Sequence, residues 1–275
     1  MNKLLVLTIL LSGPAFSETL KGRIHSIENN ILKFENGRVA FLDHKEKLDL
    51  SEDDFVEVEI DDRSSLKSIK SVIPDSLKLS SLETDTDNGP GPLFANAPGP
   101  FEPTVVQGGM QEAWNIYNRS NPYFKRISEC TDRAHVWAHD EFKRNGIKSR
   151  KVFALFTASY INSVRFKWWF HVAPLYSVNV NGQVVDLVMD YRYSDGPKTI
   201  KEWTDQFVYT KRSCKPTEKF SEFDVNPQTE NCYLMIQTMH YRLPGEIFDQ
   251  ERKNLWKVGT SEFEINNARR WAFEK

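Results

Sequence analysis

The chain has 275 residues, of which 36 are basic and 38 acidic, giving a formal net charge of −2. This small charge argues against a nucleic-acid-binding surface, which requires a clustered excess of basic residues. With 40% hydrophobic and 12% aromatic residues, the composition excludes a disordered chain and is typical of a folded one.

The first residues have the pattern of an export signal. Lys3 precedes a short apolar run that ends at Leu11, followed by a Ser-Gly-Pro break and small residues up to Ser17. This pattern predicts a secretory signal peptide over residues 1–17, cleaved before Glu18. The run is too short to span a bilayer, which takes about 20 apolar residues. We therefore expect a secreted or periplasmic protein without a membrane span.

Residues 18–78 show the signals of a small all-β domain. Asn36-Gly37 separates two strand-like runs, which is a strong hairpin signal, and apolar and acidic residues alternate around Val58. We expect four or five short strands that form a barrel or an open roll. Residues 79–105 are rich in Pro, Gly, Asn and Asp, which predicts a linker or a loop that covers a domain.

Residues 106–275 have the mixed pattern of an α+β domain. A second hairpin signal, Asn181-Gly182, joins two of its strand-like runs. Asn145-Gly146 is a plausible C-cap for the helix that precedes it. The predicted helices cover 110–118, 129–144 and 261–273, with a short one starting at 200, and the predicted strands cover 151–156, 170–179 and 183–189.

The chain has three cysteines, Cys130, Cys214 and Cys232. In an oxidising compartment an even set tends to pair, and the odd cysteine is a candidate reactive thiol. Cys214 and Cys232 are close in sequence, so we predict a disulfide between them and a free Cys130. Three reduced structural cysteines are the alternative.

Cys130 stands at the start of the predicted helix 129–144. The helix dipole and the backbone N–H groups of a first turn favour a thiolate, and the same groups can bind a developing oxyanion. On this segment alone, however, a small cysteine that packs in the core is the better interpretation.

Two further segments change that interpretation. His171 lies inside a strand-like apolar run, and Asp190 ends the partner strand of the second predicted hairpin. Such a hairpin can place imidazole and carboxylate side by side, beside the helix that carries Cys130, which is what a thiol hydrolase needs. Asp186 is a rival for the carboxylate, because strand positions an even number apart share a face.

Three segments follow one another in a recognisable order. They are Cys130–His135 (CTDRAH), Trp168–Ala173 (WWFHVA), and Asp190 followed by Gly196-Pro197 and Trp203. They resemble the Cys-x-x-Arg-Ala-His, Trp-x-aromatic-His-Val-Ala and Asp…Gly-Pro…Trp segments of bacterial protein-glutaminases, the protein-glutamine deamidases. Order and approximate spacing agree over residues 108–205. One departure is Tyr191, where that family often has Pro.

The resemblance implies a Cys-His-Asp triad of Cys130, His171 and Asp190, on a fold related to transglutaminases and papain-like proteases. We prefer Asp190 to Asp186 because its distance to the Gly-Pro and Trp positions fits the family better. The expected fold is α+β, with the Cys-bearing helix packed on an antiparallel sheet and preceded by the small all-β domain. Trp168 is expected to line the pocket or cover the His–Asp pair, or only to pack in the core.

The implied activity is that of a cysteine-dependent amidohydrolase. It would convert protein glutamine side chains to glutamate through a cysteinyl thioester, with release of ammonia. We expect no cofactor, a monomer, and protein or peptide substrates that contain glutamine. Arg133 and His135 match the family segment, and we assign both to structural support of the helix.

Several alternatives stay open. A cysteine protease or a transglutaminase would use the same triad, because the triad sets acyl-transfer chemistry and the pocket sets the substrate. A secreted binding or envelope-associated protein would carry an inactive triad or none. Residues 18–100 are either a pro-region that restrains the enzyme, as in the precursors of the family, or an accessory domain.

The histidines outside this triad carry no clear chemistry. His135 and His139 are four residues apart on a predicted helix, but neither a His-Glu-x-x-His pattern nor a third ligand is evident. We interpret them as residues of a solvated helix face and expect no metal site. His25 and His44 are isolated, and we interpret them as surface or turn residues.

Overall fold

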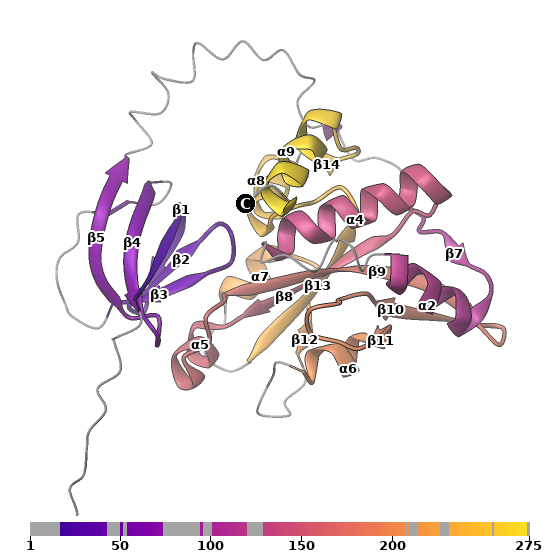
Figure 1. The fold of residues 1–275 in the computed structure, drawn as a ribbon, viewed down its shortest axis with the longest axis horizontal. Coiled ribbons are helices and arrows are strands. Elements are labelled where there is room, and N and C mark those ends of the chain that lie inside the picture. Colours follow the sequence, from indigo (N-terminus) through magenta and orange to yellow (C-terminus); the bar gives the residue numbers. More distant parts are fainter. Residues whose placement is uncertain are drawn as a thin grey trace, which may run out of the picture.

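The computed structural model describes residues 17–42, 50–51, 54–73, 94–95, 101–119, 129–206, 208, 214–225, 231–254 and 256–273. The predicted signal peptide up to residue 16, most of the predicted linker and His44 lie outside these residues. The described chain forms an N-terminal all-β sheet followed by helices packed on a second, curled sheet (Figure 1). The predicted α+β fold class is confirmed.

The N-terminal sheet is antiparallel and has the strand order β3-β2-β1-β4-β5. Phe41, at the end of β3, bridges to Ser65, immediately before β5, so the sheet curls back on itself. Its own core is made of alternating apolar side chains, as the period-2 pattern predicts. The strands are β1 (Ser17–Glu28), β2 (Ile31–Phe34), β3 (Val39–Phe41), β4 (Phe55–Asp61) and β5 (Leu66–Ile73).

The hairpin β2–β3 is buried on both faces. Leu32, Phe34 and Ala40 pack inside the N-terminal sheet. Alternate residues of the same strands, Val39 and Phe41 among them, belong to the core of the C-terminal unit, residues 101–273. Since side chains alternate across a strand, this hairpin is shared by two hydrophobic cores.

The second sheet has the order β11-β10-β9-β8-β13-β12, with β7 beside β9. Its four long strands, β10, β9, β8 and β13, pair antiparallel, whereas the short β7 and β12 add parallel pairs, so the whole sheet is mixed. The strands are β7 (Val105–Val106), β8 (Arg150–Phe156), β9 (Phe170–Val180), β10 (Gln183–Val188), β11 (Lys198–Thr199), β12 (Lys215–Pro216) and β13 (Cys232–Thr238); β6 (Phe94–Ala95) pairs with β14 (Trp256–Lys257) in a separate ribbon.

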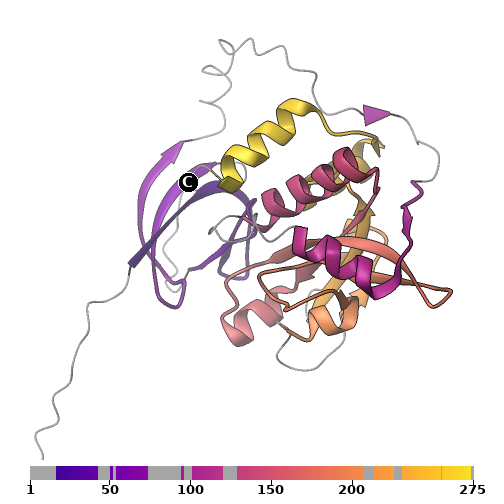
Figure 2. The same ribbon diagram turned by 45° about the vertical axis from the view of Figure 1, so that its right-hand side comes forward.

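The helix α4 (Cys130–Asn145) packs against β9 on one face of this sheet, and α9 (Glu262–Phe273) packs on α4 (Figures 1 and 2). Gly146, in the left-handed conformation with φ 70°, ends α4 as its sequence predicts. Among the described residues, no helix is long and apolar enough to cross a membrane. The other helices are α2 (Gly109–Arg119), α5 (Ala158–Val164), α6 (Ile200–Thr204), α7 (Phe220–Val225) and α8 (Pro244–Lys253).

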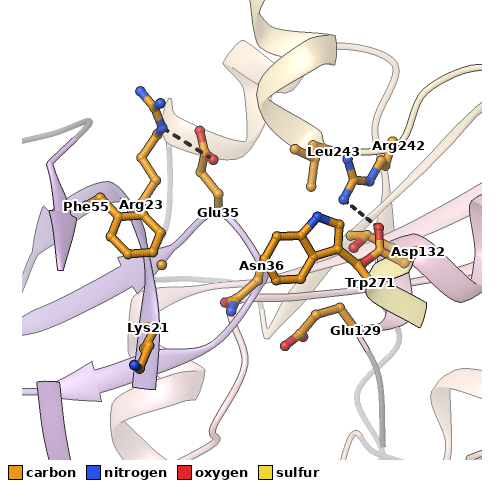
Figure 3. A pocket seen from close by; sticks show the side chains of 12 residues that line it. Lys21, Arg23, Glu35, Asn36, Phe55, Glu129, Asp132, Arg242, Leu243 and Trp271 are labelled. Carbon is orange, nitrogen blue, oxygen red and sulfur yellow. Dashed lines mark ion pairs between the residues drawn. The ribbon is translucent and has the colours of Figure 1, made fainter. Parts of the chain in front are cut away.

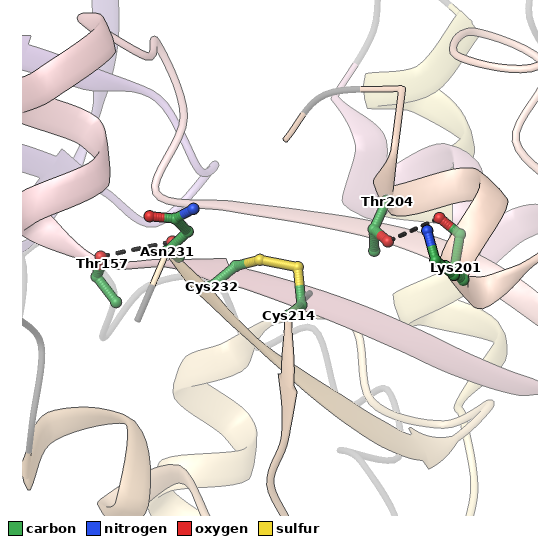
Figure 4. Close-up of a disulfide and its surroundings, with 6 residues drawn as sticks. All are labelled: Thr157, Lys201, Thr204, Cys214, Asn231 and Cys232. Atoms are coloured by element: carbon green, nitrogen blue, oxygen red, sulfur yellow. Dashed lines mark hydrogen bonds between the residues drawn. A yellow bond between two sulfur atoms is a disulfide. The ribbon is translucent and has the colours of Figure 1, made fainter. Parts of the chain in front are cut away.

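The predicted disulfide is confirmed. Cys232, the first residue of β13, is bonded to Cys214, which directly precedes β12 (Figure 4). Cys130 is the free, buried cysteine. A disulfide of this kind persists in oxidising compartments, in agreement with an extracytoplasmic location.

The interpretation of His135 and His139 as residues of a solvated helix face is wrong. They are 1% and 6% exposed, because α9 covers that face of α4. Lys151 approaches His135 Nδ1 at 2.5 Å, and the Glu264 carboxylate lies 3.1 Å from Nε2. Burial, together with the charge of Lys151, lowers the pKa of His135 well below its usual value, so the ring is neutral and accepts from Lys151. His135 thereby links α4 to Lys151 of β8 and lies beside Glu264 of α9.

Candidate active site

Cys130 is the first residue of α4 and is 3% exposed. Glu129 before it is extended, with φ −67° and ψ 141°, so the helix begins at the cysteine itself. The N–H groups of a first turn have no carbonyl partner within the helix and point away from its N-terminus. The thiol therefore lies where both the backbone N–H groups and the helix dipole favour negative charge.

His171 and Asp190 lie side by side, although they are 19 residues apart. His171 is the second residue of β9, and Asp190 follows two residues after β10, its hairpin partner. His171 Nε2 is 2.6 Å from Asp190 Oδ2. Cys130 is the other neighbour of this imidazole, since its hydrogen bond and charge act on the pKa of His171.

The charges of these groups depend on one another. Burial alone disfavours the His171 imidazolium, but Asp190 and Cys130 outweigh burial and raise the pKa of His171 to about 9. Burial likewise opposes ionisation of Asp190, yet His171, the Trp203 indole N–H and the charge of Arg133 hold its pKa below the usual value. At neutral pH the site thus favours a protonated His171 beside an ionised Asp190.

Asp186, the alternative carboxylate, is placed elsewhere. It pairs across the hairpin with Ser177 and accepts hydrogen bonds from Ser177 Oγ at 2.8 Å and from Arg150 at 2.5 Å. The carboxylate that is hydrogen-bonded to His171 is Asp190.

Aromatic side chains complete the surroundings of the His–Asp pair. Trp203 donates its indole N–H to Asp190 Oδ2 at 2.8 Å, and its ring lies 5.6 Å from that of His171. Tyr193 meets the imidazole edge to face, with ring centroids 4.8 Å apart. From the sequence, Trp203 was noted only as part of the third family-like segment, and that position was the sign that it belongs to the site. Tyr193 was not predicted.

A small cavity of about 90 Å³ opens at the thiol. Trp168 lines it, whereas Trp203 is the tryptophan that touches the His–Asp pair. Arg133 also lines the cavity. The lining residues are Arg38, Glu129, Cys130, Arg133, Trp168, His171, Arg192 and Tyr193.

One of these lining residues comes from the N-terminal sheet. Arg38 lies in the turn between β2 and β3, and its guanidinium carbon is 5.1 Å from the centre of the Trp168 ring. The backbone pairs as well: Trp169 N–H donates to Gly37 O at 2.8 Å, and Val39 N–H donates to Lys167 O at 3.1 Å. The hairpin β2–β3 therefore covers the cavity at Cys130, and we call it the covering hairpin.

His25 also lies at this junction, so its interpretation as a surface or turn residue is wrong. Its ring stacks on Trp169 with centroids 4.3 Å apart and meets Phe220 edge to face at 6.4 Å. Burial, aided by the charge of Lys33 and opposed by Glu28, lowers the pKa of His25 to about 4.

A thiol at a helix N-terminus, an imidazole and a carboxylate in hydrogen-bonded series form the arrangement of thiol hydrolases and acyl transferases. Residues 111–207, which include all three groups, match the family model described as glutaminase. The resemblance to protein-glutaminases is therefore confirmed for this stretch. The match supports an amidohydrolase of the glutaminase and deamidase type.

Solved structures of protein-glutaminases resemble this chain at low sequence identity. The crystal structure of a pro-protein-glutaminase is 16% identical, with a TM-score of 0.46, over 82% of this chain and 84% of that chain. The NMR structure of protein-glutaminase from Chryseobacterium proteolyticum is 18% identical, with a TM-score of 0.37, over 52% of this chain and 80% of that chain. No curated protein matches the chain.

Proposed function

We propose that the protein is a secreted or periplasmic protein-glutamine deamidase, with Cys130 as nucleophile, His171 as acid and base, and Asp190 as the group that orients His171. The observation that carries this proposal is the series Cys130–His171–Asp190, with 2.6 Å between imidazole and carboxylate, inside the stretch that matches the glutaminase family model. Protein substrates follow from the same family match.

The first half-reaction forms a thioester. The Cys130 thiolate attacks the carboxamide carbon of a glutamine side chain, and the negative charge moves to the amide oxygen. Backbone N–H groups of the first turn of α4 lie on the side of the thiol where this oxyanion forms, and they stabilise it. The His171 imidazolium then gives its proton to the departing nitrogen, which leaves as ammonia.

The second half-reaction returns the enzyme to its starting state. Neutral His171 takes a proton from a water molecule, which attacks the thioester carbon. The carbon–sulfur bond breaks, glutamate is released, and the thiolate–imidazolium pair is restored. Asp190 keeps Nε2 protonated throughout, while Trp203 holds the carboxylate in place through its N–H.

A direct test is incubation of the protein with a mixture of glutamine-rich proteins, followed by mass spectrometry and an ammonia assay. Deamidation predicts the mass shift of an amide replaced by an acid at glutamine, together with ammonia release that requires Cys130. Cleaved peptide bonds would indicate a protease instead, and glutamine–lysine cross-links would indicate a transglutaminase. If no thiol reagent labels Cys130 faster than a denatured cysteine even in a folded chain of residues 101–275, a binding protein without activity would be supported.

We further propose that residues 18–100 restrain this activity as a pro-region. The support is the covering hairpin, which pairs with the backbone of residues 167–169 and brings Arg38 to the cavity at Cys130. Because the N-terminal sheet is tethered to the enzyme, its effective concentration at the site is on the order of millimolar, so even a weak contact keeps the site covered.

A further inference from the structure

A groove of about 780 Å³ follows the outer edge of β13, the side of the second sheet on which β12 lies. In the described chain, β12 pairs with β13 only at Tyr233 and Leu234. Ile236 and Gln237 come next along β13, and both line the groove. Since neighbouring side chains of a strand point to opposite faces, a groove lined by both runs along the edge of the sheet.

The backbone of β13 is open toward this groove. Thr217 N–H donates to Leu234 O at 2.9 Å, so the backbone groups of Leu234 point away from β8. Backbone groups alternate in direction along a strand, so the N–H and C=O of Ile236 point the same way. Among the described residues, no strand pairs with Ile236 on this side. An open edge of this kind accepts one more strand.

Apolar side chains and one buried amide surround the open edge. Ile236, Phe248 and Trp256 line the groove and are 39%, 42% and 37% exposed. Gln250 also lines it but is buried, and its Oε1 has no hydrogen-bond partner among the described residues. A buried amide oxygen without a partner costs free energy, and a donor from a bound chain removes that cost.

The charges of the groove are balanced. Two acidic residues, Glu218 and Glu251, and two basic ones, Lys219 and Arg252, line it. Glu251 accepts backbone N–H groups at the start of α7, and Arg252 pairs with Asp249. Such a groove suits an uncharged, extended segment with apolar residues at alternate positions.

The groove belongs to the same sheet as His171. His171 pairs with Ala154, and Ala154 pairs with Leu234, so the three residues form one row across β9, β8 and β13. A strand added to β13 lies about 14 Å from β9, three strand spacings away. An extended chain covers about 3.4 Å per residue, so a short stretch of one polypeptide reaches from the groove to the candidate active site.

The groove adjoins the junction between the N-terminal sheet and the C-terminal unit. Phe248 meets Phe220 edge to face at 5.6 Å, and Phe220 meets His25 of β1. The junction has a separate cavity of about 370 Å³, to which Arg23 and Arg242 contribute from the two parts (Figure 3). All residues that line the groove, in contrast, belong to the C-terminal unit. The groove is therefore complete with or without the cover.

We propose that this groove is a docking site for the protein substrate, which binds as an extended segment and adds a strand to β13. The proposal rests on the proposed function, because it presumes a protein whose glutamine reaches Cys130. A single chain fits better than a second copy, since residues of α7 and α8 stand beside the edge and would stand beside that of the copy as well.

The first test measures binding to residues 18–275 by fluorescence anisotropy. The probe is a fluorescein-labelled peptide without glutamine, in which valine and threonine alternate over about eight positions. We expect a dissociation constant on the order of 0.1 mM. Backbone N-methylation of the peptide should weaken binding about tenfold or more, because it removes the donors that pair with an edge strand.

Variants separate docking from a structural role. Ile236→Glu should weaken probe binding about tenfold, because it puts a charge into the apolar part of the groove. Val184→Glu is the matched control, since Val184 is an exposed strand residue outside the groove, and affinity should not change. Gln250→Leu should lower affinity about threefold without lowering Tm, because Oε1 loses no partner within the described chain.

The second test joins the valine–threonine segment to a glutamine through a flexible spacer of about ten residues. The comparison peptide has serine in place of each valine, and ammonia release by residues 18–275 is measured. The docking segment should lower KM about tenfold with kcat unchanged, because a contact of about 0.1 mM is tethered at about 1 mM. Ile236→Glu should make the two peptides equal.

The outcomes distinguish this inference from the proposed function. Absence of probe binding, equal binding by Ile236→Glu, or equal KM for the two peptides overturns the docking site, while ammonia release leaves the proposed function standing. A dimer that Ile236→Glu dissociates also overturns it, because a second copy then occupies the edge. Probe binding that depends on Ile236 without ammonia release from either peptide overturns the proposed function, and the occupant is then not a substrate.

Discussion

Two hairpins of this molecule carry the same Asn-Gly turn signal and have different tasks. The hairpin β9–β10 carries His171 and leads to Asp190, and its Gly182, with φ 85°, has space around it: a Cβ there would meet no described atom within 4 Å. The covering hairpin also turns at a glycine, Gly37, with φ 90°, but a Cβ there would lie 3.1 Å from Phe170. The turn at Gly182 only reverses the chain, whereas the turn at Gly37 packs tightly against β9, the strand that carries His171.

The comparison suggests that a site and its cover can be separated by experiment. Contacts within β9–β10 set the geometry of His171 and Asp190. Contacts of the covering hairpin, such as the Trp169 indole N–H that donates to Phe34 O at 2.6 Å, hold the cover in place. Changes in the first group should remove activity, and changes in the second group should release it.

The largest expected effect is at the carboxylates of the β9–β10 hairpin. Asp190→Asn should reduce ammonia release by about a thousandfold or more, because an amide no longer holds the imidazole in the required tautomer. Asp186→Asn is the matched control: its carboxylate binds Arg150 and Ser177, so activity should stay within a few-fold of the unchanged chain. A greater loss at 186 than at 190 would reverse the assignment.

The next effect concerns the cover as a whole. A chain of residues 101–275 should turn over a glutamine-containing protein about tenfold faster or more than residues 18–275, because the tethered sheet no longer competes with substrate. Residues 18–100 added separately should inhibit the shorter chain. Circular dichroism and mapping of the Cys214–Cys232 bond check that the shorter chain is folded. Unchanged or lower turnover in a folded shorter chain would make the N-terminal sheet an accessory domain.

Acid should loosen the cover through His25. Its pKa is about 4 when stacked on Trp169 and 6.5 when exposed, so the uncovered state binds the extra proton. The N-terminal sheet therefore docks on the C-terminal unit with full strength above pH 6.5. As the pH falls toward 4, the equilibrium constant for docking decreases, by at most about tenfold per pH unit. The turnover ratio of residues 101–275 to residues 18–275 should fall over this range. His25→Asn should make that ratio independent of pH there; an equally steep ratio in the variant would rule out His25 as the cause.

The smallest effect compares the two glycines. Alanine at Gly37 or Gly182 strains a left-handed backbone by about 1 kcal/mol. Only Gly37→Ala also presses a methyl group against Phe170, so it should raise full-chain turnover about threefold while Gly182→Ala leaves turnover unchanged. Both variants should lose similar stability in thermal unfolding. Equal turnover in the two variants would mean that the turn is not fitted to Phe170.

Local signals predicted much of this structure. Asn-Gly pairs place both hairpins, and Gly146 ends α4, because these residues accept positive φ without help from the rest of the fold. The odd cysteine and the three ordered segments pointed to Cys130, His171 and Asp190.

Contacts between distant segments were not predictable in the same way. The spacing of His135 and His139 says which face of α4 they share, but not that α9 covers that face. His25 looked isolated because Trp169, its stacking partner, is 144 positions further along the chain. The strand β2 has apolar residues on both faces, which was a sign that both faces are buried, although the sequence does not name the second partner.

The burial of Cys130 bears on its chemistry in an oxidising compartment, where the disulfide Cys214–Cys232 persists. A thiolate in an oxidising compartment is open to sulfenic acid formation and to mixed disulfides, and further oxidation is irreversible. Cys130 is 3% exposed, and Arg38 and Trp168 line the small cavity at its thiol, so the covering hairpin restricts the access of oxidants to the sulfur. The proposed pro-region would therefore also keep the thiol of Cys130 reduced until it is released.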